Sequence, residues 1–132
     1  MASHRKHIEK AQHNEGLLQP LFALDTHPDW YITTAFYAGV HWIRAYLALN
    51  GIGQGEKDQV GYTEFDQKLR DVSRSTGVSV DTLIREFGIL HRLGRDARYV
   101  CQTKHWYDQR VSDADAALKA IRDFVTANGI NP

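Results

Sequence analysis

The stretch from Asp29 to Asn50, DWYITTAFYAGVHWIRAYLALN, constrains the fold more than any other part of this 132-residue chain. It contains no proline and a single glycine, so it can form a continuous helix of about six turns. On a helical wheel its apolar residues fall in two adjacent rows, which together cover more than the ~100° apolar face of an ordinary surface helix. The rows are Phe36, Val40, Ile43 and Leu47, and Ala35, Gly39, Trp42 and Tyr46. We therefore expect a central helix with neighbours on most of its sides.

The remaining side of this helix is a narrow polar strip that carries Thr34, Tyr37, His41 and Arg44. His41 and Arg44 are i, i+3 neighbours, a spacing at which both side chains can reach one anion. The alternative is that Tyr37 and His41 hydrogen-bond to a neighbouring helix while Arg44 is exposed. Trp30 and Tyr37, on the strip side, are also candidates for an interface.

Bulk composition predicts one domain over residues 1–132. The 16 basic residues equal the 16 acidic ones, which argues against a protein that coats nucleic acid through its overall charge but leaves room for a local basic groove. The single cysteine, Cys101, and a polar N-terminus without a signal-peptide pattern predict a cytoplasmic protein. No apolar run reaches about 18 residues, so no membrane span is expected.

The segment before the central helix predicts a first helix over residues 3–18. Pro20 removes a backbone donor, so a kink or a restart is expected there, followed by a turn over residues 25–29. Asp29 is the expected N-cap of the central helix. The Asn-Gly pair at 50–51 is a typical signal for its C-terminal end.

Beyond a predicted surface loop over residues 51–61, a short helix is expected. Thr63 and Asp66 have the spacing of a capping box with aspartate in place of glutamate. Residues 75–77, Ser-Thr-Gly, are expected to end this helix. Its apolar face would consist of Phe65, Leu69 and Val72.

The rest of the chain predicts two longer helices. One starts at Ser79 or Asp81 and continues to about Thr103, with Gly94 as its weakest point at a cost of ~1 kcal/mol relative to alanine. After a loop over residues 106–111, Ser112 is the expected cap of the last helix. Since β-type alternation is nearly absent, the fold class is all-α, a single bundle of four to five helices.

Within the fourth helix, a regular continuation would place His91, Arg98 and His105 at successive i+7 positions, beside its apolar face. An inward arginine is costly unless it is paired or lines a cleft, which makes Arg98 and His105 the leading functional pair. The alternative is a structural ion pair of Arg98 with Asp96 or Asp113.

Other kinds of site have weaker support. The chain has no Gly-rich phosphate loop, no cysteine pair for zinc and no G-x-S-x-G elbow. The grouping of His4, His7 and His13 is typical of solvated surface histidines, although a metal-binding bundle with three convergent histidines is a further hypothesis. No cofactor or metal is expected.

Three segments, in this order, resemble a known family. They are HIEKAQHNEGLL, DWYITTAFYAGVHWIRAYLA and LHRLGRDARYV. They are similar to small bacterial and archaeal HEPN domain proteins in an Ala-x-His-Asn segment (residues 11–14), in a D-W-x-x-T-x-x-F-Y-A-x-x-H core helix (residues 29–41) and in an S-R-x-A-R-Y-like segment (residues 94–99). The resemblance covers residues 4–126, nearly the whole chain.

This resemblance implies an up-and-down helical bundle of HEPN type that forms a homodimer. Many such proteins are metal-independent RNases with an R-x4–6-H motif, which Arg98 and His105 match in spacing. Others bind RNA or nucleotides, associate with a protein partner encoded nearby, or serve as accessory domains in toxin–antitoxin and defence systems. Two positions depart from the family pattern: Tyr99 follows the arginine where active members usually carry Asn, Asp or His, and residues 61–65 lack a His-x-x-Arg.

Two functional hypotheses follow. The first is an RNA- or nucleotide-associated binding module that uses Tyr37, His41, Arg44, Arg95 and Tyr99. The alternative is an endoribonuclease in which His105 acts as general acid or base and Arg98 stabilises the charge that develops on phosphorus. Both predict that the polar strip of the central helix faces the segment from Arg95 to His105.

Overall fold

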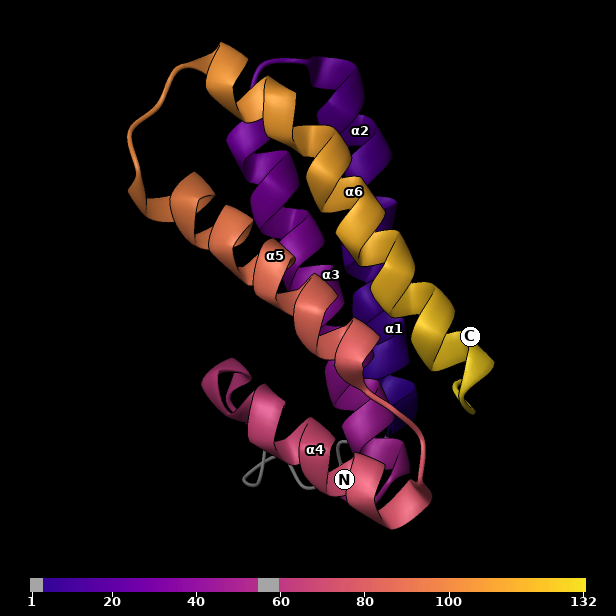
Figure 1. Ribbon diagram of the computed structural model, residues 1–132. Coiled ribbons are helices and arrows are strands. Elements are labelled where there is room, and N and C mark those ends of the chain that lie inside the picture. The colour runs from indigo at the N-terminus through magenta and orange to yellow at the C-terminus, as the bar shows by residue number, and fades with distance from the viewer. Residues whose placement is uncertain (1–3, 55–59) are drawn as a thin grey trace.

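A computed structural model describes residues 4–54 and 60–132, and over this part of the chain it contains helices and no β-strand (Figure 1). The predicted all-α class is therefore confirmed. At the centre lies α3 (Pro28–Leu49), which packs most extensively against three long helices. These are α1 (His4–Gly16), α5 (Asp81–Tyr99) and α6 (Lys104–Ala127).

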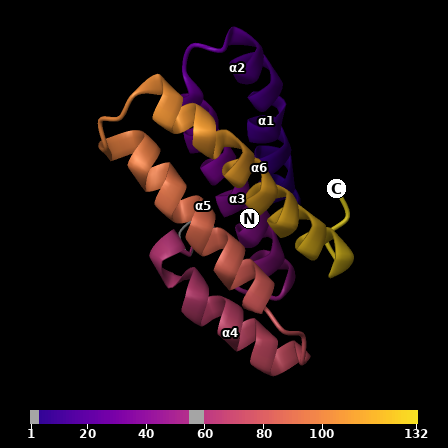
Figure 2. The same ribbon diagram turned by 45° about the horizontal axis from the view of Figure 1, so that its top comes forward.

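The four long helices alternate in direction along the chain, as the colours of Figure 1 show. The short α2 (Leu18–Leu24) lies at the end of the bundle where α1 leads into α3. A 3-10 turn, η2 (Tyr62–Glu64), leads into α4 (Phe65–Thr76), which lies against the opposite end of α3 and the start of α5 (Figure 2). Of the predicted loop over 51–61, residues 55–59 lie outside the described residues.

The central helix is apolar on most sides because three long helices, and the shorter α2 and α4 at its ends, pack against it. Both predicted rows are buried along their full length, and Phe36, Trp42, Ile43 and Leu47 are each at most 1% exposed. Burying a large apolar side chain contributes about 1.5–3 kcal/mol, so the burial of these two rows stabilises the core. The predicted central position of this helix is confirmed.

Two glycines allow α5 to approach α3 closely. A Cβ at Gly94 would lie 2.8 Å from the Cβ and Cγ atoms of Phe36, and one at Gly39 would lie 2.6 Å from a methyl group of Leu90. Gly94 was expected to weaken its helix, but its lack of a side chain serves the packing of Phe36. The C-terminal half of α5 therefore lies directly over the Phe36 ring.

The start of α3 differs from the predicted one. The helix begins at Pro28, with His27 at the N-cap position and Asp29 inside the first turn. Proline suits the first turn because the N–H that it lacks has no intrahelical partner there. Asp29 is thus not the cap, although its charge still favours the positive end of the helix dipole. The predicted restart near Pro20 is confirmed, since α1 ends at Gly16 and α2 begins at Leu18.

The boundary between α5 and α6 is the largest correction. Helix α5 ends at Tyr99 because Val100 takes an extended conformation, and α6 begins at Lys104. Thr103 caps α6 by accepting a hydrogen bond from the backbone N–H of Trp106. The predicted loop over 106–111 and the predicted cap Ser112 are therefore wrong.

At the other end of the bundle, the predicted capping box is also wrong. Thr63 lies in the 3-10 turn, and the residue before α4, Glu64, makes no side-chain cap bond. The end of α4 is as expected, since Gly77 takes the left-handed conformation at φ 76°. Over the described residues, none of the helices combines the length and apolar character needed to cross a membrane.

Candidate binding groove around Arg98

Arg98 lies in the last turn of α5 and is held among aromatic rings. Its guanidinium carbon lies 4.7 Å from the ring centre of Phe36, 5.6 Å from that of Tyr37 and 5.4 Å from that of Tyr99. These distances fall within the range of cation–π attraction, which is worth about 0.5–2 kcal/mol depending on desolvation. The arrangement depends on Gly94, one turn earlier, which lets the Phe36 ring approach the backbone of α5.

The Nη1 atom of Arg98 is buried and has no hydrogen-bond partner in the described part of the chain. No ion pair of Arg98 is found there either, so the predicted alternative, a pair with Asp96 or Asp113, is not formed. Asp96 lies 3.9 Å from Arg95 instead. A buried donor without a partner is unfavourable by about 1–3 kcal/mol, more when charged, and is uncommon in folded proteins.

A groove of about 340 Å³ lies beside this arginine, between the first half of α3 and the end of α5. Three large aromatic side chains at or near the groove are exposed: Trp30 by 57%, Tyr37 by 41% and Tyr99 by 74%. One carboxylate, that of Asp29, shares the groove with the guanidinium. The lining residues are Asp29, Trp30, Thr33, Tyr37, Ala97 and Arg98.

A basic strip continues from the groove along α5. His91, Arg92 and Arg95 line a shallow hollow of about 220 Å³ next to Gly88. The His91 ring stacks on Phe36, and burial, with smaller contributions from Arg98 and Arg95, lowers the pKa of His91. The imidazole is therefore neutral at pH 7, and the positive charge of the strip comes from its arginines.

The predicted polar strip of α3 divides among three neighbours. Tyr37 faces Arg98, whereas His41 lies against His7 of α1, with their Nδ1 atoms 3.1 Å apart. Arg44 donates from Nε to the carbonyl oxygen of Val60 at 3.1 Å. Of the three, only Tyr37 lines the Arg98 groove.

His105 lies in the first turn of α6 and is exposed. It is separated from Arg98 by the end of α5 and the connector, so the expected alignment of the two on one regular helix is wrong. Among the described side chains, no hydrogen bond or ion pair joins them. That part of the chain also contains no group of three or more His, Cys, Asp or Glu residues placed to hold a metal ion.

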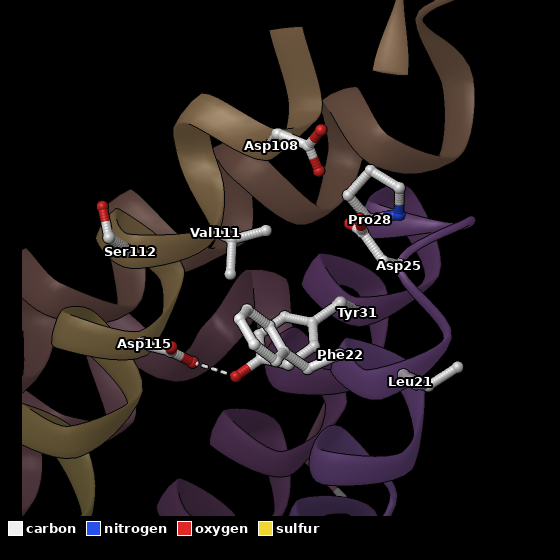
Figure 3. Close-up of a pocket in the computed structure, with 9 residues that line it drawn as sticks. All are labelled: Leu21, Phe22, Asp25, Pro28, Tyr31, Asp108, Val111, Ser112 and Asp115. Carbon is white, nitrogen blue, oxygen red and sulfur yellow. Dashed lines mark hydrogen bonds between the residues drawn. The ribbon is translucent and has the colours of Figure 1, made fainter. Parts of the chain in front are cut away.

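A second cavity, of about 390 Å³, which was not predicted from the sequence, lies between α2, the start of α3 and α6 (Figure 3). The Tyr31 hydroxyl donates to Oδ1 of Asp115 at 2.5 Å on one side of it. The other lining residues come from separate segments of the chain. They are Leu21, Phe22, Asp25, Pro28, Asp108, Val111 and Ser112.

Comparison with protein-family models, with curated proteins and with solved structures found no match to this chain. The Arg98 groove and the cavity beside Tyr31 are therefore interpreted from their own chemistry.

Proposed function

We propose that this protein is a HEPN-like helical module that binds RNA or a nucleotide in the Arg98 groove. The carrying observation is the Arg98 guanidinium, which has a buried nitrogen without a partner and borders a groove with exposed aromatic rings. A guanidinium matches phosphate oxygens in geometry and charge, and every nucleobase has a face that can stack on Trp or Tyr.

The groove offers a separate partner for each part of a nucleotide. Arg98 would bind the phosphate, and Trp30, Tyr37 or Tyr99 would stack on a base. The carboxylate of Asp29 would accept a hydrogen bond from a ribose hydroxyl or an exocyclic amine. Arg92 and Arg95 extend the positive charge along α5, which would attract a longer strand despite the balanced net charge.

This proposal differs from the sequence-based one in two residues. His41 and Arg44 direct their polar atoms to His7 and Val60, away from Arg98, so we assign them to the scaffold. Tyr37, Arg95 and Tyr99 are retained as binding residues. The homodimer and the partner encoded nearby remain predictions.

The alternative, an endoribonuclease, requires a general acid or base close to the phosphate bound at Arg98. His105 is exposed at the start of the next helix and does not contact Arg98. In this chain the pair would need a second copy, or a bound strand reaching across the connector, to act together. Binding therefore has more support than cleavage.

The test measures the affinity of wild type and of two arginine variants for a labelled single-stranded RNA by fluorescence anisotropy. Competition by AMP measures whether a single nucleotide binds at the same site. Arg98→Ala is expected to weaken RNA binding by about 10- to 100-fold, because it removes charge-assisted hydrogen bonds. The matched control is Arg85→Ala on the same helix, whose side chain is 65% exposed and lies outside the groove. It removes the same charge and is expected to change binding by less than about threefold.

Absence of RNA and AMP binding by wild type would overturn the proposal, as would equal losses in the two variants. If wild type cleaved the RNA, and Arg98→Ala and His105→Ala both abolished cleavage, the nuclease assignment would replace the binding assignment.

A further inference from the structure

The cavity beside Tyr31 combines an apolar surface with carboxylates. Leu21, Phe22, Pro28 and Val111 supply the apolar surface, and the rings of Phe22 and Tyr31 meet edge to face with centres 6.2 Å apart. Figure 3 shows Asp25 and Asp108 on one side of this space and Asp115 on the other. Over the described part of the chain, no arginine, lysine or histidine lines it. Its chemistry thus differs from that of the Arg98 groove, which is lined by an arginine.

The rim of this cavity already holds an ammonium group of the chain itself. The Nζ atom of Lys104 lies 2.8 Å from an oxygen of Asp108 and 3.3 Å from one of Asp25. The lysine side chain is 47% exposed, so this contact is a surface ion pair that can open at little cost. The pair demonstrates that the two aspartates are spaced to accept one primary ammonium between them.

Among the described residues, no cation forms an ion pair with Asp115, across the cavity. It accepts a hydrogen bond from Tyr31, and burial, followed by this bond, raises the pKa of the Tyr31 hydroxyl, so the phenol stays protonated and donates. The nearest basic residues of α6, Lys119 and Arg122, pair with Asp123 and Glu15 in the adjoining groove. A carboxylate can accept several hydrogen bonds, and the phenol uses only one of these positions.

We propose that this cavity binds a small organic amine, a primary ammonium on an apolar body. The ammonium would bond to Asp115, and the apolar body would pack on Phe22 and Val111, with Asp25 and Asp108 across the cavity adding negative charge. The lining favours this class over an anion, which three carboxylates would repel, and over a bare metal ion, which would leave the apolar surface unused. A volume of about 390 Å³ also lies in the range of small-molecule sites, which is about 300–1,000 Å³.

Calorimetric titration with three probes of similar shape tests the chemistry: phenethylamine, 2-phenylethanol and phenylacetate. Phenethylamine is expected to bind at least about tenfold more tightly than 2-phenylethanol, because a charge-assisted hydrogen bond is worth about 1.5–3 kcal/mol. Phenylacetate is expected not to bind, because the aspartates repel its negative charge. Equal binding of amine and alcohol, or no binding of the amine at millimolar concentration, would overturn the proposal.

Variants of the aspartates test the location. Asp115→Asn is expected to weaken amine binding about tenfold. Asp108 lies across the cavity and is paired with Lys104, so Asp108→Asn is expected to weaken it by less. Asp113→Asn is the matched control, since this aspartate lies on the same helix but lines a different groove. Phe22→Ala, a change at an exposed residue that leaves the charges intact, is expected to weaken the amine and the alcohol alike. Unchanged binding in Asp115→Asn would contradict this location.

Lys104→Gln provides a test whose expected result would not follow if the aspartates of the cavity had only a structural role. It removes the ammonium that now pairs with Asp108, so phenethylamine is expected to bind severalfold more tightly. Weaker binding in this variant would overturn the assignment. If the blocked lysine N-acetyl-lysinamide bound more tightly than phenethylamine, the occupant would be a lysine of a protein partner, and the small-molecule assignment would be wrong.

Discussion

The Nδ1 atoms of His7 and His41 lie 3.1 Å apart and join α1 to α3, with the two rings stacked at 5.3 Å between centres. One nitrogen must donate and the other accept, so at least one imidazole is neutral. The Nε2 atom of His7 is buried without a hydrogen-bond partner among the described residues. An unpaired acceptor is easier to bury than an unpaired N–H of a charged ring, so we assign the proton of His7 to Nδ1 and make His41 the acceptor.

This pair predicts that stability falls in mild acid. Burial, followed by the charges of neighbouring groups, lowers the pKa of His41 to about 4, and burial with Arg44 lowers that of His7. Because both values lie below 6.5, the unfolded chain binds protons first as pH falls. The free energy of unfolding should hold its full value above about pH 6.5 and decrease by about 1–2 kcal/mol by about pH 5.5.

Urea unfolding at about pH 7.5 and about pH 5.5 measures this effect. His41→Gln is expected to reduce the difference by about half or more, since it removes the group with the largest shift. His13→Gln, at an exposed position of α1, should retain it. Equal stability of wild type at the two pH values would contradict the prediction.

The glycines of α5 predict opposite effects for the same substitution. Gly94→Ala places a methyl group 2.8 Å from Phe36 in the core and is expected to destabilise the protein by about 1–3 kcal/mol. Gly88→Ala, two turns earlier, meets no atom within 4 Å and is expected to stabilise it by about 0.5–1 kcal/mol through helix propensity. Thermal unfolding of the two variants decides the matter. If both were stabilising, the close approach at Phe36 would be wrong.

The corrected start of α6 can be tested at its cap. Thr103→Ala removes the oxygen that accepts from the Trp106 N–H and is expected to lower the free energy of unfolding by about 1 kcal/mol. Ser112→Ala, at the residue that the sequence predicts as the cap, is expected to be neutral or slightly stabilising because this position lies inside the helix. A larger loss for Ser112→Ala than for Thr103→Ala in denaturant unfolding would restore the sequence-based boundary.

Glu15 is expected to be the most sensitive acidic residue of α1. Its Oε1 atom accepts from Nε1 of buried Trp42 at 3.0 Å and from Arg122 at 3.2 Å, so it links α1 to α3 and α6. Glu15→Ala leaves a buried indole N–H without its partner, which should cost about 1–3 kcal/mol. Glu9→Ala, at an exposed position of the same helix, should change stability by less than about 0.5 kcal/mol in the same assay.

Features set by nearby residues were predictable from the sequence. The central helix ends within a residue of the expected position, and its two apolar rows are buried, because periodicity and the Asn50-Gly51 pair act locally. The α5–α6 boundary was not predictable in the same way. The residue that caps α6, Thr103, follows a sequence whose helical pattern is uninterrupted. The end of α5 also involves a hydrogen bond from the Tyr107 hydroxyl to the Val100 carbonyl, which the sequence does not reveal.

The candidate site was also only partly predictable from the sequence. The sequence places Tyr37, His41 and Arg44 on one side of a helix, but it does not determine which neighbour each one meets. Periodicity fixes the direction of a side chain relative to its own helix, whereas its partner depends on how the helices pack. The cavity beside Tyr31 was missed for this reason, since its three aspartates come from two turns of α6 and from the α2–α3 connection.

The four-residue connector, 100–103, has a consequence for engineering Arg98 and His105. Were both on one continuous helix, each inserted residue would rotate one side chain about 100° relative to the other. With the break in place, a glycine added to the connector would lengthen the path between them while leaving the helical phase of each unchanged. The length of the connector can thus be changed independently of the helices. Such a change would alter how far His105 reaches toward an RNA strand bound at Arg98 without repacking the core.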